Sequence, residues 1–162
     1  MKNGKIDLIN IMKYLMVVAL IAYVVFLISR EGSNDVPVDT IEKNITQTIN
    51  TKGMSKGNSQ DLKKYYGLNA NDYDGVMLYI PNDVMSVNEV LVVKVKDESQ
   101  TEDVEKAVQT RLDTQKKSFE GYGVEQTKLL GSAIVESKGS YTILAVSKNA
   151  DKIDQAFRKS IR

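Results

Sequence analysis

The stretch from Tyr14 to Ser29, YLMVVALIAYVVFLIS, holds sixteen residues without a charged side chain. A helix that crosses the hydrocarbon core of a bilayer needs about 20 mostly apolar residues, so this stretch alone is short. Apolar residues between Ile9 and Met12 extend it upstream, because Lys13 can run its aliphatic stem along the helix while its ammonium stays among the headgroups. The pattern predicts a transmembrane signal anchor over 14–29, with contact to the lipid bilayer through residues 9–29.

The charges that flank this stretch indicate its orientation. Three lysines but only one acid, Asp7, lie before the uncharged stretch. An excess of lysine marks the cytoplasmic side, so residues 1–13 are predicted to be a cytoplasmic tail and the C-terminal part to lie outside. Two alternatives stay open: a cleaved secretory signal, although no small-x-small motif follows the stretch, and a buried helix of a soluble domain.

The rest of the chain is predicted to form one domain at the outer face of the cytoplasmic membrane. Residues 30–36 are polar and precede Pro37, which is typical of a linker. The remaining residues, 37–162, are enough for one domain with a hydrophobic core. Beyond residue 29 the chain carries 19 basic and 20 acidic side chains. This near neutrality speaks against a nucleic-acid-binding surface, which is normally basic.

The sequence contains no cysteine and no histidine. Without cysteine there is no disulfide, no thiol nucleophile and no thiolate metal site. Without histidine the usual general base, the commonest zinc ligand and the serine-type triad are missing. We therefore expect a protein that is not an enzyme and that holds no cofactor.

Two hairpins and several helices are predicted for 37–162. The fold class is α+β, with a four-stranded antiparallel sheet and helices packed on one face. Valines 93 and 95 alternate with lysines 94 and 96, which is expected where one face of a sheet is wet. The predicted strands cover 76–80, 89–96, 133–136 and 141–147, and the predicted helices cover 39–49, 60–66, 102–119 and 150–161.

Helix ends are predicted from capping residues. Asp39 with Glu42 fits the capping box of the first helix, and Ser59 is placed to cap the second. Ser99 and Thr101 both offer N-caps for the long helix, and Ser99 with Glu102 fits the capping box. Gly67 is expected to end that helix in the left-handed conformation.

Arg111 and Gln115 lie on one face of the predicted long helix, at the edge of its apolar stripe. A guanidinium there needs a planar acceptor, and Glu89 at the start of the second strand is a plausible one. Two interpretations remain: an ion pair that locks helix to sheet, or a polar site for a ligand or partner formed by Glu89, Arg111, Gln115 and Tyr122.

Two other groups of residues are weaker candidates. The loop around Asp72 and Asp74 has carboxylates and a glycine in calcium-loop order, but Ala70 and Pro81 occupy positions that require carboxylates, so a solvated turn is expected. Six tyrosines could form a sugar-binding or partner surface, or could be core rings with a solvated hydroxyl. They are Tyr65, Tyr66, Tyr73, Tyr79, Tyr122 and Tyr141.

Several short motifs between 37 and 162 resemble a bacterial family, domain of unknown function 4358. They are Tyr65-Tyr66-Gly67-Leu68, Met85-Ser86-Val87-Asn88-Glu89, the long-helix residues Arg111, Gln115, Phe119 and Tyr122, Ala133, and Gly139-Ser140-Tyr141. The resemblance implies a short, membrane-anchored protein, typically of Gram-positive bacteria, with no assigned activity. It also implies a gene neighbourhood with membrane-bound O-acyltransferases, and hence an accessory role in modifying envelope polymers.

Three functions follow as expectations. The first is an accessory or scaffold domain that docks on a larger envelope machine near the membrane. The alternative is a binding module for a wall polymer or small ligand, with a concave site lined by tyrosines and by Arg111 or Glu89; the third is a hydrolase or transferase. An apolar patch would favour docking, a polar cleft ligand binding, and clustered acids with raised pKa values catalysis.

Overall fold

The computed structural model describes residues 8–29 and 35–162, in two compact units, Met1–Gly32 and Ser33–Arg162. The first seven residues of the predicted tail and residues 30–34 of the predicted linker lie outside the described residues. The first unit contains helix α1 (Leu8–Ser29), whose residues 11–23 are all exposed. Over the residues that the structure describes, no helix combines the length and the apolar character needed to cross a membrane.

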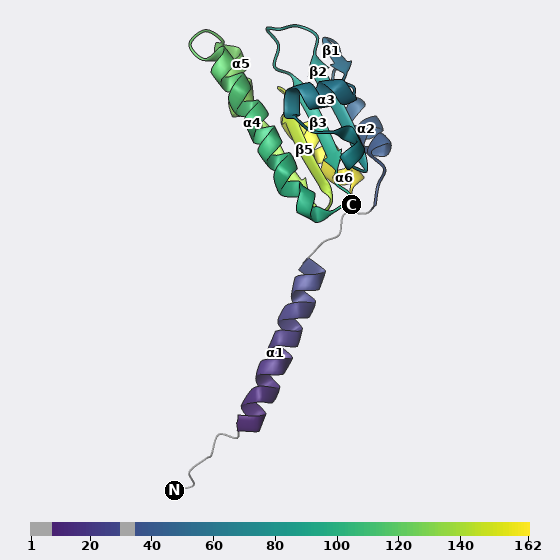
Figure 1. The fold of residues 1–162 in the computed structure, drawn as a ribbon, viewed down its shortest axis with the longest axis vertical. Coiled ribbons are helices and arrows are strands. Elements are labelled where there is room, and N and C mark those ends of the chain that lie inside the picture. The colour runs from purple at the N-terminus through teal and green to yellow at the C-terminus, as the bar shows by residue number, and fades with distance from the viewer. Residues whose placement is uncertain (1–7, 30–34) are drawn as a thin grey trace. The chain divides into compact units, whose positions relative to one another are not determined.

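The second unit is built on a five-stranded antiparallel sheet with the strand order β1-β2-β3-β5-β4 (Figure 1). The two predicted hairpins are confirmed as β2–β3 and β4–β5, and pairing of β3 with β5 joins them at the centre, where Leu91 lies opposite Leu144. The strands are β1 (Met54–Lys56), β2 (Gly75–Pro81), β3 (Glu89–Lys94), β4 (Ile134–Lys138) and β5 (Tyr141–Val146).

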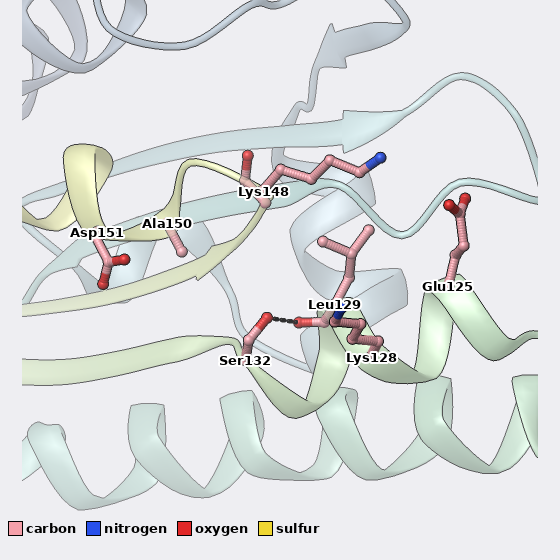
Figure 2. Close-up of a pocket in the computed structure, with 8 residues that line it drawn as sticks. Glu125, Lys128, Leu129, Ser132, Lys148, Ala150 and Asp151 are labelled. Atoms are coloured by element: carbon pink, nitrogen blue, oxygen red, sulfur yellow. Dashed lines mark hydrogen bonds between the residues drawn. The ribbon is translucent and has the colours of Figure 1, made fainter.

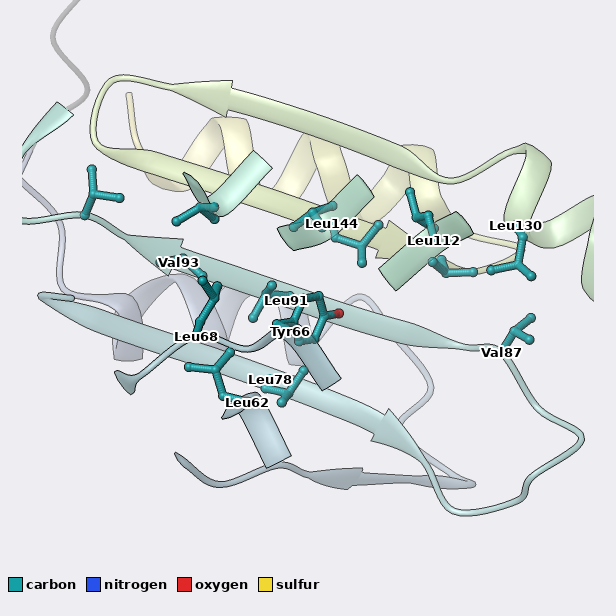
Figure 3. Packing of buried hydrophobic residues seen from close by; sticks show 14 of the residues in the cluster. Leu62, Tyr66, Leu68, Leu78, Val87, Leu91, Val93, Leu112, Leu130 and Leu144 are labelled. Atoms are coloured by element: carbon teal, nitrogen blue, oxygen red, sulfur yellow. The ribbon is translucent and has the colours of Figure 1, made fainter. Parts of the chain in front are cut away.

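Helices cover both faces of this sheet. Helices α3, α4 and α5 enclose one apolar cluster, which includes Leu62, Leu91 and Leu112 (Figure 3). Helices α2 and α6 enclose a second cluster on the other face, which includes Ile41 and Phe157. The helices are α2 (Val38–Thr46), α3 (Ser59–Tyr66), η1 (Ala70–Asp72), η2 (Glu98–Gln100), α4 (Thr101–Phe119), α5 (Val124–Gly131) and α6 (Ala150–Ser160).

The predicted α+β class is therefore correct. The predicted number of strands, four, is wrong, and so is the prediction that helices cover only one face of the sheet. The additional strand, Met54–Lys56, is only three residues long and lies between two glycines, and it pairs with β2 as an edge strand. Every residue of β3 and of β5 is buried, so each face of the central strands needs a cover. The alternation of lysine with valine predicted one solvated face. The Lys94 side chain is buried, however, because it forms a salt bridge to Asp35 and lies against the Tyr141 ring.

The predicted N-caps are also wrong at three helices. Helix α2 begins after Pro37 without a side-chain cap, and α4 follows the short helix η2, which Asp97 caps. Asn58 caps α3 one residue before the predicted Ser59, in a reciprocal pair with Asp61. Gly67 ends α3 with φ of 71°, as predicted.

The chain enters the second unit along one end of the sheet. The backbone N–H of Val36 donates to the Tyr141 hydroxyl at 2.7 Å, and that hydroxyl donates to the Val36 carbonyl at 2.6 Å. Lys94 pairs with Asp35 at the same end, since Lys94 lies opposite Tyr141 in the β3–β5 register. We call this the entry end and the opposite end of the sheet, where β3 begins, the distal end.

Candidate functional site

Glu89 is the first residue of β3, and none of its surface is exposed. Side chains two residues apart share a face of a strand, so Glu89 lies on the face of Leu91 and Val93, under α3 and α4. Four donors from these two helices meet its carboxylate. A buried carboxylate needs such donors, because desolvation of an unpaired charge costs several kcal/mol.

Arg111 on α4 supplies two of these donors. Its Nη2 lies 2.8 Å from Glu89 Oε2, and its Nε lies 3.2 Å from Oε1. The guanidinium stacks on the Tyr65 ring, with 4.5 Å from Cζ to the ring centroid. The Arg111 side chain is 14% exposed, so Arg111 contacts solvent whereas Glu89 does not.

Tyr66 and Gln115 supply the other two donors. The Tyr66 hydroxyl donates to Glu89 Oε1, and Gln115 Nε2 donates to Oε2 at 3.0 Å. Tyr66 stands at the end of α3 among the leucines of the first apolar cluster (Figure 3). Gln115 Oε1 is buried and has no hydrogen-bond partner within the described part of the chain.

The charges of this network are compensated. Burial raises the pKa of Tyr66 well above 10, and the charge and hydrogen bond of Glu89 raise it further, so the phenol stays protonated. Burial lowers the pKa of Arg111, but the hydrogen bond and charge of Glu89 outweigh this and the pKa is raised overall. The network therefore holds one negative and one positive charge and ties α3, β3 and α4 together.

Tyr122 lies apart from these residues. It follows the end of α4, is 64% exposed, and its ring stacks 5.7 Å from the Phe119 ring. Its hydroxyl donates to the Ser118 carbonyl. The structure thus brings together Glu89, Arg111 and Gln115 from the predicted set, and leaves Tyr122 on the surface.

Tyr66 is the member of the network that the sequence did not assign to it. The only signal in the sequence was the position of Tyr66 at the end of a short helix with an apolar face. This position predicts that the ring is buried but does not identify a hydrogen-bond partner for its hydroxyl. The six tyrosines do not form one surface. Tyr66 packs on one face of the sheet, whereas Tyr141 and Tyr79 pack on the other, where the Tyr79 hydroxyl donates to Glu42 at 2.8 Å.

The second unit has cavities beside α5 and α6, between α3 and β2, and beside the first residues of β3, and none of Glu89, Arg111, Gln115 and Tyr122 lines these. The first of these, of about 450 Å³, lies between α5 and the start of α6 (Figure 2). Its charged residues are Glu125, Lys128, Lys148 and Asp151, so its lining is neutral overall. A second, of about 320 Å³, lies beside it and shares Ser147 and Lys148.

A pair of acids lies where β4 meets α6. Arg158 Nη2 is 2.6 Å from Glu136 Oε2, and Arg158 Nε is 2.8 Å from Asp154 Oδ2. Burial raises the pKa of Glu136, and the hydrogen bond and charge of Asp154 raise it further, against the effect of Arg158. Neither acid lines these cavities.

No group of three side chains that could hold a metal ion is found among residues 8–29 and 35–162. Asp74 of the calcium-like loop lies 3.5 Å from Lys94, and Asp72 is exposed. This arrangement is that of a solvated turn.

The fold and the network define a small α+β domain whose most buried polar group ties helices to a five-stranded sheet. The family model of a domain of unknown function (DUF4358) matches residues 47–147, which is well over half of the chain, and the chain belongs to this family. The matched region contains the whole Glu89 network. Neither the curated proteins nor the solved structures contain a match to the chain.

Proposed function

We propose that this protein is a membrane-anchored, non-enzymatic accessory domain that docks on a protein partner of the cell envelope. The observation that carries the proposal is that four large apolar side chains are exposed on two loops that are hydrogen-bonded to each other; we call Val84, Met85, Tyr122 and Val124 the distal patch. These side chains are 90%, 50%, 64% and 82% exposed. An exposed cluster of large apolar side chains is typical of an interaction site.

The distal patch is formed by two loops that are fixed to each other. Gln126 Nε2 at the start of α5 donates to the Met85 carbonyl at 2.8 Å. The Met85 N–H donates to Asp83 Oδ1 at 2.8 Å, which closes the β2–β3 loop on itself. Tyr122 is held on Phe119, whose own ring is buried. A surface with this internal bonding loses little conformational entropy on binding.

The chemistry of the patch favours a protein over a lipid surface. Methionine and tyrosine are enriched in protein interfaces. Loops that insert into membranes usually carry an excess of lysine and arginine for the anionic headgroups. The segments 82–88 and 117–128 instead contain three acids and two lysines. The two loops that carry the patch, β2–β3 and α4–α5, lie at the distal end of the sheet, away from the entry end (Figure 1).

The anchor is part of the same proposal and rests on the sequence of residues 9–29. Residues 11–23 of helix α1 are exposed and include large apolar side chains such as Leu15 and Ile21. The lysines before it favour an N-terminus inside and a single pass. A short linker would hold the domain at an effective concentration in the mM range toward membrane partners.

The choice of partner rests on the family resemblance alone, which favours an O-acyltransferase system that modifies envelope polymers. Catalysis is less well supported than docking, because the sequence has no histidine or cysteine that could act as general base or nucleophile. The predicted ligand site of tyrosines with Arg111 or Glu89 also loses support, since Glu89 is fully buried.

The test uses a photo-crosslinking amino acid in place of Val124 in the full-length chain, expressed in its native host. We expect one covalent adduct of discrete mass with a protein, lost when Val84→Ser is added. The same probe in place of Val135, which is 41% exposed on β4 and outside the patch, should give no such adduct.

Three results would overturn the proposal. An adduct of twice the chain mass would show a second copy on the patch, and an adduct with lipid would show a bilayer. Equal adducts from positions 124 and 135 would show unspecific collisions.

A further inference from the structure

The cavity of about 320 Å³ at the distal end has a lining unlike that of its neighbour. It lies between the loop after α2, the first residues of β3, the end of β5 and the start of α6. We call it the amide cavity. Its lining is Ile49, Asn50, Lys52, Met54, Asn88, Val90, Val146, Ser147, Lys148, Asn149 and Ile153.

The apolar part of the lining is rigid. Val146 belongs to the first apolar cluster, whereas Val90 and Ile153 belong to the second; all three are at most 1% exposed, so they support the cavity from beneath and offer no surface to a ligand. Ile49 and Met54 are partly buried and pack against the second cluster. A ligand with a short apolar portion would therefore meet a preformed surface, which avoids the cost of ordering it.

The polar part of the lining carries only positive charge. It contains two lysines, three asparagines and one serine, and no acid. Neither Lys52 nor Lys148 forms an ion pair within the described residues. The neighbouring cavity, in contrast, balances Lys128 and Lys148 with two acids (Figure 2).

The asparagines add uncharged donors. Asn50 uses its Oδ1 to accept the Lys52 N–H at 3.0 Å, which leaves its amide N–H groups for another partner. Asn149 precedes α6, and its side chain makes no capping hydrogen bond. Amide and ammonium donors together, without a competing carboxylate, favour an anionic group of a ligand.

We propose that the amide cavity binds a small organic anion, a carboxylate or phosphate ester with a short apolar portion. Lys52 and Lys148 attract the anionic group, the Asn50 and Asn149 amides donate hydrogen bonds to it, and the partly buried Ile49 and Met54 side chains contact the apolar portion. The volume is at the lower end of ligand sites, which limits the bound group to a small one. This proposal does not depend on docking at the distal patch.

The test is a titration of the full-length protein in uncharged detergent, followed by the NMR signals of Ile49 and Met54. The probes are acetate, butyrate, inorganic phosphate and the neutral butyramide. We expect saturable shifts with butyrate or phosphate, stronger for butyrate than for acetate, and no saturation with butyramide. Lys52→Gln should weaken binding of the anion about 3- to 5-fold, as expected for one exposed charge.

Lys128→Gln is the matched control, because Lys128 lines only the neighbouring cavity. It should leave the affinity unchanged. Both lysines are exposed, so neither substitution should unfold the domain, and circular dichroism checks this. Absence of saturation with every anion, equal binding of butyramide, or a loss caused by Lys128→Gln and not by Lys52→Gln would each overturn the proposal.

Discussion

Glu89 shows how a single buried charge can organise a small domain. Its carboxylate accepts from Tyr66, Arg111 and Gln115, which come from two helices on one face of the sheet. Removing one partner of a buried ion pair leaves an uncompensated charge and costs about 3–5 kcal/mol. The network therefore stabilises the packing of α3 and α4 on β3, and its exposed edge is limited to Arg111 and Tyr65.

Arg111→Met tests the structural role at this scale. We expect the free energy of unfolding to fall by about 3–5 kcal/mol, because Glu89 stays buried without its counter-charge. Urea denaturation of the full-length protein measures it. Adding Glu89→Gln should recover part of the loss, since the double variant buries no charge. An unchanged urea midpoint for Arg111→Met would instead indicate that Arg111 serves a ligand or partner.

At the scale of elements, helix α3 depends on a cap that its sequence context does not single out. Asn58 Oδ1 accepts from the N–H groups of Gln60 and Asp61 at 2.8 and 3.2 Å, and Asp61 Oδ2 accepts from the Asn58 N–H at 2.9 Å. Ser59 was an equally plausible cap by residue type. The adjacent glycine and the path of the chain beside β2 decide which of the two lies outside the helix, since the Gly57 N–H donates to the Leu78 carbonyl at 2.9 Å.

Asn58→Ala should lower the free energy of unfolding by about 1 kcal/mol, the usual value of an N-cap. Ser59→Ala, one residue away, should change it by a few tenths at most. Thermal and urea unfolding of the two variants in parallel provide the comparison. A larger loss for Ser59→Ala than for Asn58→Ala would contradict the assignment of the cap.

The central strands are the second element-scale feature. Val90 to Val93 is a continuous apolar run, which is typical of a strand buried on both faces. The lysines at 94 and 96 obscured this signal, because the alternation they form with valine predicts one wet face. Lys94 is buried by its pairing with Asp35, a contact between residues far apart in the sequence.

The two ends of the sheet in the second unit carry different features. The entry end holds the chain through Tyr141 and Lys94, whereas the distal end carries the distal patch and the amide cavity. The antiparallel arrangement produces this separation, since the β2–β3 loop and the β5–α6 connection leave the sheet at the same end.

The proposed topology can be tested on intact cells. Protease added outside should degrade residues 35–162 and spare an N-terminal tag, because the lysines before α1 favour the cytoplasmic side. Permeabilised cells, in which the tag becomes accessible, provide the control. If the second unit were protected and the N-terminal tag accessible, the orientation would be the reverse of the one proposed.

The sequence by itself determined the α+β class, both hairpins, the long helix and the membership of Glu89, Arg111 and Gln115 in one polar group. These follow from periodicity and from the local needs of buried charge, which act over a few residues. The tertiary structure alone decided the fifth strand, the second covered face, the inclusion of Tyr66 and the separation of Tyr122. Each of these depends on which distant segments pack together, and local propensity carries no information about that.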